Sequence, residues 1–204
     1  HATWTLQKQD SASVEMTVSL MSLPLTIRRL VSVRAGRIVI RDEIRNASSV
    51  ELDFDYLQHP AFGGRILEGG IRIEFGDADF VDAATGQRRS WPRGVDADGR
   101  EATVGIVSPS DVRTVYGTVG PVADRRARIV SDTWDLAIEL DWRESPLEVA
   151  WVWQELSSSP EFPWFKRARV LAVEPSSIRA DDLAHPGRLT LSSGEGLVCS
   201  MSAT

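Results

Sequence analysis

The sequence has 204 residues, of which 42% are hydrophobic and 25% are charged, proportions that exclude a disordered, collagen-like or low-complexity chain. The formal net charge is −6 and no lysine-rich run occurs, so we expect no nucleic-acid partner, because an acidic surface repels phosphate backbones. No apolar run approaches the roughly 18 residues that a membrane-spanning helix needs, and we expect no membrane partner either.

Along the chain, apolar residues alternate with polar ones at the two-residue period of β-strands. The predicted strands cover residues 14–20, 37–44, 51–58, 71–75, 103–107, 128–130, 136–142, 147–156, 167–174 and 188–201. Turn-forming pairs such as Thr85-Gly86 and Ser193-Gly194 separate them. The polar residues 86–100 are expected to form a long loop, and residues 177–184 are the best candidate for a short helix.

This series of short strands, with little helix and no linker, predicts an all-β fold, a large antiparallel β-sandwich formed as a single domain by residues 1–204. Cys199 is the only cysteine and lies in an apolar strand pattern, so we expect it to be buried and inert. A chain that cannot form an internal disulfide favours a cytoplasmic location. The three histidines are not at metal-ligand spacing, and we expect no metal site.

The first candidate for chemistry is His59, in the segment from Tyr56 to Gly64. Proline restricts the residue before it to extended geometry, so Pro60 holds His59 at the end of a strand. Alternation places His59 on the more polar face of that strand, together with Asp53 and Asp55. From these residues alone, a structural histidine that hydrogen-bonds a backbone carbonyl is the better interpretation.

Glu174 is the second candidate, because it ends an apolar strand and precedes Pro175, which fixes the local geometry. Burial at this position raises the pKa of a carboxyl toward the range of a general base, unless Arg167 or Arg169 offsets it. The alternative is a strand-end glutamate in a surface ion pair. Without further information, that alternative is preferred.

A third segment, residues 147–156, combines indole rings with an amide and a carboxylate. Trp153, Gln154 and Glu155 are adjacent there, and alternation places Trp151 on the same face as Trp153 and Glu155. The chain has seven tryptophans against six phenylalanines and two tyrosines, and an indole face stacks well on the C–H face of a pyranose. The segment favours sugar recognition, although core packing explains any single tryptophan equally well.

Together these segments resemble the aldose 1-epimerase (galactose mutarotase) family, in particular its divergent bacterial members. The matches occur in the same order along the chain: Leu23-Pro24-Leu25, Arg28-Arg29, Arg45-Asn46-Ala47-Ser48, His59-Pro60-Ala61-Phe62-Gly63, Trp153-Gln154-Glu155, Pro163-Trp164 and Leu171-Ala172-Val173-Glu174-Pro175-Ser176. The resemblance implies the large antiparallel β-sandwich of that family, which the strand pattern predicts independently.

The resemblance also implies an isomerase that interconverts sugar anomers, with His59 as general acid on the ring oxygen and Glu174 as general base on the anomeric hydroxyl. It implies further substrate-binding residues, which are Trp153, Gln154, Glu155, Trp164 and, as the candidate for the family's sugar-binding aspartate, Asp111. No cofactor is implied. The expected partner is a small sugar molecule, and a monomer or a homodimer is expected.

The sequence departs from the family pattern near its start. It lacks an upstream arginine motif, and His1 is followed by Ala2 where the family has a His-Gly motif, so His1 receives no role. We expect that N-terminal strands of the family are missing from this sequence. Two alternatives stay open: a non-catalytic carbohydrate-binding or regulatory domain, and a hexose-phosphate epimerase, which needs convergent arginines such as Arg65, Arg88, Arg89 and Arg93.

Overall fold

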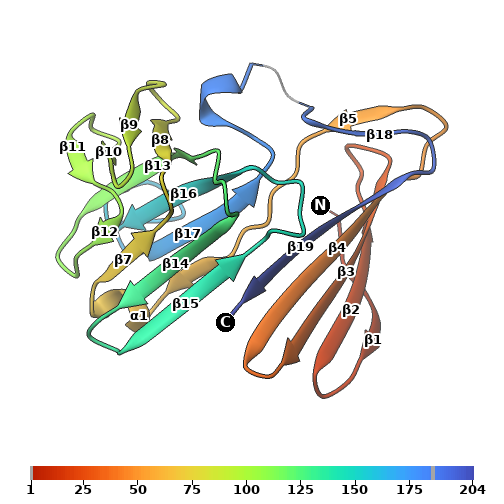
Figure 1. The fold of residues 1–204 in the computed structure, drawn as a ribbon, viewed down its shortest axis with the longest axis horizontal. Helices are drawn as coiled ribbons and strands as arrows, with labels where there is room; N and C mark the ends of the chain where they lie inside the picture. Colours follow the sequence, from red (N-terminus) through yellow and green to blue (C-terminus); the bar gives the residue numbers. More distant parts are fainter. Residues whose placement is uncertain (1, 185–186) are drawn as a thin grey trace.

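The computed structural model describes residues 2–184 and 187–204, and two large antiparallel sheets form most of it (Figure 1). The nine-stranded sheet contains, in spatial order, β1 (Thr5–Gln9), β2 (Ser13–Ser19), β3 (Leu25–Arg34), β4 (Arg37–Asn46), β19 (Gly196–Ala203), β15 (Leu136–Asp141), β14 (Arg126–Ser131), β7 (Ile71–Glu74) and β12 (Ile106–Val107). The six-stranded sheet contains β6 (Ala61–Gly63), β17 (Arg169–Ser176), β16 (Val149–Leu156), β13 (Arg113–Val119), β8 (Asp79–Asp82) and β9 (Arg88–Ser90). Two further strand pairs are β10 (Arg93–Val95) with β11 (Glu101–Thr103), and β18 (Leu189–Leu191) with β5 (Leu52–Phe54).

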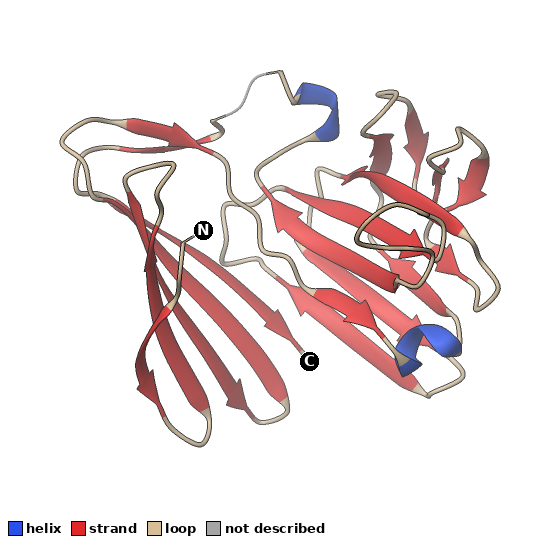
Figure 2. Ribbon diagram, turned by 180° about the vertical axis from the view of Figure 1, so that it is seen from behind, coloured by secondary structure: helices blue, strands red, loops and turns tan. Residues whose placement is uncertain are grey.

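Helical structure in the described residues is limited to two short segments, as Figure 2 shows from behind. These are α1 (Arg65–Glu68) and the 3₁₀ turn η1 (Ala180–Asp182). The all-β fold class predicted from the strand pattern is therefore confirmed, whereas the helix expected at residues 177–184 is reduced to a single turn. Within the described part of the chain, no helix is both long and apolar enough to cross a bilayer.

The main core lies between the two sheets, because alternation turns one face of each strand inward. The six-stranded sheet contributes Val115, Val119, Ala150, Val152, Leu156, Leu171 and Val173, and the nine-stranded sheet contributes Ile71, Ile73, Ala127, Ile129 and Leu140. The other face of β13, β16 and β17 is thereby turned away from this core. That second face carries the aromatic and acidic side chains that form the candidate site.

Several predicted segments differ from the structure, and the strands expected at residues 103–107 and 188–201 are each divided between two strands. Of the strand expected at residues 51–58, only Leu52–Phe54 pairs as a strand. Beyond it the chain crosses between the sheets, where the side chains of Tyr56 and Gln58 hydrogen-bond to Asp42. The loop expected at residues 86–100 contains β9 and β10, because short polar strands lack the apolar alternation that identifies longer ones.

Strand β13 is one of the elements that are absent from the predicted strands. A Cβ at Gly117 would lie 2.3 Å from Val81 O and 2.6 Å from the ring of Phe80, so only glycine permits this approach of β13 to β8. A glycine in a strand interior lowers β-propensity and interrupts the hydrophobic pattern. Gly117 therefore permits the close packing of β13 on β8, and the same residue makes β13 difficult to recognise in the sequence.

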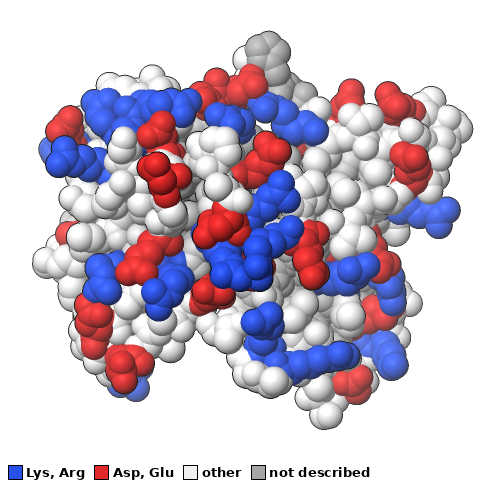
Figure 3. All heavy atoms as spheres, in the orientation of Figure 1, with Lys and Arg blue, Asp and Glu red and all other residues white. Residues whose placement is uncertain are grey.

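Charged side chains of both signs are interspersed on the face of the molecule shown in Figure 3. Many of them form exposed ion pairs, such as Arg28 with Glu15 at 2.8 Å and with Glu43 at 3.0 Å. Exposed pairs of this kind stabilise a fold only slightly, because water screens their attraction.

Candidate functional site

His59 and Glu174 lie in direct contact, with His59 Nε2 and Glu174 Oε1 3.1 Å apart. Two backbone hydrogen bonds join their segments on either side of this contact. Gln58 N donates to Pro175 O at 3.0 Å, and Val173 N donates to Pro60 O at 3.3 Å. Because Val173 is buried in the core, alternation along β17 turns Glu174 to the opposite face, toward His59.

The two side chains differ strongly in exposure. The Glu174 side chain is 6% exposed, whereas that of His59 is 49% exposed. Burial raises the pKa of Glu174 above the ordinary glutamate value, and the charge of His59 opposes this rise. A carboxyl with a raised pKa exchanges its proton closer to neutral pH. The pair can therefore transfer protons, and His59 faces solvent, where a ligand can approach.

Aromatic rings flank the pair on the same face of the sheet. Trp153 meets the ring of His59 at 6.0 Å between centroids, and it meets Trp164 at 5.3 Å. Trp151 is buried, its Nε1 donates to Ile178 O at 3.0 Å, and Tyr116 stacks on it at 4.5 Å. The structure thus brings the predicted Trp153 and Trp164 to the pair, and it adds Tyr116.

Tyr116 is absent from the sequence-based candidates because β13 is absent from the predicted strands. The available signal is the alternation of Val115, Gly117 and Val119, which points three small or apolar residues inward and Tyr116 outward. Gly117 weakens this signal. In the sheet register Tyr116 lies opposite Trp153, and this position brings Tyr116 near His59 and Glu174.

Gln154 is placed on the core face of β16, where it is fully buried. Its Nε2 donates to Val104 O at 2.6 Å, and its Oε1 accepts from Arg113 Nε at 3.2 Å. Both ends of the amide are thus occupied within the protein. A sugar on the opposite face of the sheet cannot reach it, so we do not include Gln154 in the proposed site.

Glu155 shares the face of Trp153 but is also buried, and it closes the loop that follows β16. Its carboxylate accepts hydrogen bonds from Ser158 N, Ser159 N, Ser159 Oγ and Thr114 Oγ1 at 2.6–3.1 Å. Burial raises the pKa of Glu155, but these hydrogen bonds, with those of Ser159 the strongest, bring it below the ordinary glutamate value. The contacts give Glu155 a structural role.

We therefore expect Glu155→Gln to destabilise the protein by about 1–3 kcal/mol, because an amide nitrogen cannot accept the hydrogen bonds that the buried carboxylate accepts. Urea denaturation measures the loss. Glu161→Gln is the matched control, because Glu161 is an exposed residue in the same loop. Unchanged stability combined with weaker sugar binding would instead return Glu155 to the substrate-binding role implied by the family resemblance.

Asp111 lies in the loop before β13 and has partners there. Its Oδ2 accepts from Ser108 N at 2.9 Å and lies 3.3 Å from Arg113 Nη2, and its backbone carbonyl accepts from Arg169 Nη1 at 2.8 Å. These contacts fix the loop, and none of them involves His59 or Glu174. We leave Asp111 out of the proposed site. His1 and His185 lie outside the described residues.

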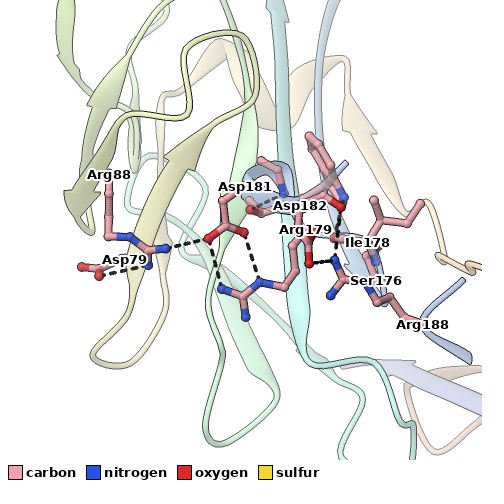
Figure 4. Close-up of polar contacts among 11 residues, drawn as sticks. Asp79, Arg88, Ser176, Ile178, Arg179, Asp181, Asp182 and Arg188 are labelled. Carbon is pink, nitrogen blue, oxygen red and sulfur yellow. Dashed lines mark hydrogen bonds and ion pairs between the residues drawn. The ribbon is translucent and has the colours of Figure 1, made fainter. Parts of the chain in front are cut away.

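In the segment after β17, the carboxylate of Asp181 lies between the guanidinium groups of Arg88 and Arg179 (Figure 4). Ala180 packs on Trp151 and Val81, and its backbone nitrogen donates to Thr118 Oγ1 at 3.1 Å. Arg88 Nη2 donates to Asp181 Oδ2 at 2.7 Å, and this ion pair ties the segment to β9. The segment therefore buries Trp151 and leaves the side with His59 open.

A buried polar network supports the crossing segment that ends at His59. Asp42 is fully buried and accepts hydrogen bonds from Arg29 Nε at 2.6 Å and from Arg29 Nη2 at 2.9 Å. It also accepts from Tyr56 hydroxyl at 2.6 Å and from Gln58 Nε2 at 2.9 Å. The network thus connects β3 and β4 to the residue next to His59.

Cys199 is buried in β19, and burial raises the pKa of its thiol to about 11, as expected of an inert cysteine. Among residues 2–184 and 187–204, no group of three or more His, Cys, Asp or Glu side chains is arranged to hold a metal ion.

Comparison with known proteins places this geometry in a structural context. The sequence matches no protein-family model, and a search of curated proteins also finds no match. A solved structure from Escherichia coli K12, whose name includes aldose 1-epimerase, matches with a TM-score of 0.74 at 17% identity, over 98% of this chain and 67% of that chain. The chain has the galactose mutarotase-like fold.

Two further solved structures share the mutarotase-like fold. A protein from Synechocystis sp. PCC 6803 has a TM-score of 0.72 at 16% identity, covering 98% of this chain and 65% of its own. A galactose mutarotase-like protein from Lactobacillus casei has a TM-score of 0.67 at 16% identity, covering 98% and 72%. At these identities the likeness concerns the fold alone. The chain spans about two thirds of the length of these structures.

Proposed function

We propose that this chain interconverts the anomers of an aldose, with Glu174 as general base and His59 as general acid. The observation that carries the proposal is the 3.1 Å contact between a buried carboxyl oxygen and a half-exposed imidazole nitrogen. The mutarotase-like fold supports it, because some proteins of that fold are named for aldose 1-epimerase or galactose mutarotase.

The chemistry needs two proton transfers at atoms bonded to the same carbon. The Glu174 carboxylate accepts the proton of the C1 hydroxyl while protonated His59 donates to the ring oxygen, and the bond between C1 and the ring oxygen breaks as the C1 carbonyl forms. Rotation about C1–C2 turns the other carbonyl face to the hydroxyl. Closure reverses both transfers and restores the protonation state of the pair. The short distance between the two groups suits this demand, because both must reach one hemiacetal centre.

The aromatic rings supply the rest of the proposed site. Trp153 lies beside His59, and Trp164 lies beside Trp153, so their faces can stack on the C–H surface of a pyranose ring. We also propose that residues 1–204 form a single domain, which contains both proton-transfer groups.

A neutral sugar fits the described surroundings better than a sugar phosphate. Arg88 is engaged by Asp79 and Asp181, Arg65 lies over the ring of Trp134, and Arg89 pairs with Glu101. Arg65, Arg88 and Arg89 thus meet different partners. Arg93 lines one hollow with Arg89, but Glu101 lines it as well, and its carboxylate repels a phosphate. A phosphate group needs several converging donors, so we propose an unphosphorylated aldose as substrate.

Saturation-transfer NMR between the α and β anomers of glucose and galactose tests the proposal. We expect the exchange rate to increase in proportion to the protein concentration. Sugar binding without any acceleration over buffer would contradict the catalytic proposal and indicate a carbohydrate-binding domain.

The pH dependence follows from the raised pKa of Glu174. Only the ionised carboxylate accepts a proton, so activity should fall as the pH decreases through that pKa. Because burial raises this pKa, we expect the midpoint of the acid limb to lie above the ordinary glutamate value of 4.5. Measuring kcat/KM from about pH 4 to about pH 8 locates the limb. An acid limb at or below 4.5 would assign the base to a more exposed group.

A further inference from the structure

The side chain of Tyr116 lies on the sheet face that carries the candidate site, and its hydroxyl group is exposed there. The residue is 51% exposed, and its ring stacks on Trp151 at 4.5 Å between centroids, with 27° between the planes. Among the described residues, none forms a hydrogen bond with its hydroxyl. The stack therefore holds the ring in place, and the hydroxyl remains available to a ligand.

The sheet order fixes where Tyr116 lies relative to the proton-transfer pair. The strands run β6, β17, β16, β13, so β17 with Glu174 lies between β6 and the strand of Tyr116. His59 precedes β6 by two residues and approaches Glu174 from the β6 side. Tyr116 approaches from the β13 side. Burial raises the pKa of Tyr116, and the charge of Glu174 adds to this rise, as expected for groups on one face.

A hemiacetal carbon bound at this pair directs its third heavy-atom neighbour away from both groups, on one of two sides according to the anomer. C1 carries the ring oxygen, the anomeric hydroxyl and C2. With the ring oxygen at His59 and the anomeric hydroxyl at Glu174, C2 is the remaining heavy-atom neighbour, and it is directed away from His59. On the side of Glu174 away from His59 lies Trp151, its register partner on β16, and the ring of Tyr116 stacks on Trp151.

We infer that Tyr116 is a specificity-determining residue whose hydroxyl hydrogen-bonds the 2-hydroxyl of the bound sugar. The inference rests on the proposed function, because it uses the same orientation of the sugar at His59 and Glu174. It assigns to this chain a preference for aldoses that carry a 2-hydroxyl within reach of Tyr116. Sugars that lack this group bind without the contact.

The test compares wild type and Tyr116→Phe on glucose and on 2-deoxyglucose, which differ only at C2. Phenylalanine keeps the ring stacked on Trp151, so the fold is retained. We expect Tyr116→Phe to lower kcat/KM for glucose roughly tenfold, the effect of losing one hydrogen bond, and to change it less than about twofold for 2-deoxyglucose. For wild type, 2-deoxyglucose should be a poorer substrate than glucose.

Equal losses on both sugars, or no loss on glucose, would overturn the assignment of Tyr116. Quenching of tryptophan emission gives the Kd of each sugar independently of catalysis. Sugar binding with this selectivity but without acceleration of anomer exchange would support the role of Tyr116 and contradict the proposed reaction. If no sugar changes the emission or exchanges faster with the wild-type protein, both the assignment of Tyr116 and the proposed reaction fail.

Discussion

Replacing Glu174 by glutamine is expected to lower the rate of anomer exchange by about 10²–10⁴-fold, the usual contribution of a positioned acid or base. Glutamine has nearly the same shape but cannot accept the proton of the C1 hydroxyl at neutral pH. Saturation-transfer NMR on wild type and Glu174→Gln measures the difference. A variant that retains wild-type activity would remove Glu174 from the mechanism.

The same substitution should also raise the melting temperature at neutral pH. Burial raises the pKa of Glu174 in the folded protein, so the folded state holds this proton to a higher pH than the unfolded chain does. The stability contributed by Glu174 is thus present below pH 4.5 and is lost as the pH rises through the raised pKa. Glutamine does not ionise, so Glu174→Gln does not lose this stability as the pH rises.

Thermal denaturation at several pH values tests the stability effect. The advantage of Glu174→Gln over wild type should grow from acid to neutral pH and vanish below about pH 4.5. Glu43→Gln is the matched control, because Glu43 is a half-exposed glutamate on β4. A destabilised Glu174→Gln at neutral pH would show that the attraction of His59 outweighs the burial of the carboxylate.

Replacing Asp42 by asparagine should cost about 3–5 kcal/mol of stability, because it leaves the charge of Arg29 without its buried partner. The amide nitrogen of asparagine is a donor, and it would face donors from Arg29, Tyr56 or Gln58. Urea denaturation measures the loss. The control Glu43→Gln, in an exposed ion pair on the same strand, should have a much smaller effect.

The Asp42 network also bears on the site, because Gln58 is adjacent to His59 and its backbone nitrogen donates to Pro175 O. Loosening the crossing segment should increase the mobility of His59 and reduce activity even where the protein remains folded. Similar stability of Asp42→Asn and Glu43→Gln would show that the four hydrogen bonds of Asp42 are not worth more than an exposed pair.

The fold class was accessible to sequence reasoning because alternation is a local property. Strands such as β16 and β17 show it over several residues, and their expected and observed positions nearly coincide. Strand β13 was not accessible, because Gly117 satisfies a packing demand from β8 that lies elsewhere in the chain. Short strands such as β9 have too few residues for any periodicity to appear.

Some residues of the candidate site could likewise be predicted from the sequence, and others could not. His59 and Glu174 were selected by their local segments and by family resemblance, and Trp153 and Trp164 came with them. Gln154 and Glu155 carry suitable chemical groups, but hydrogen bonds from Arg113, Thr114 and the 158–159 loop occupy them. The sequence of residues 153–155 does not indicate these hydrogen-bond partners.

The amino-acid order alone therefore determined that this is an all-β chain and which segments carry an imidazole and a carboxyl. Only the tertiary structure decided that the two groups meet, that Tyr116 lies on the same sheet face as Glu174, and that Gln154 and Glu155 already have hydrogen-bond partners. The physical reason is that side-chain periodicity is set by each residue and its neighbours, whereas proximity and burial are set by strand register between distant segments.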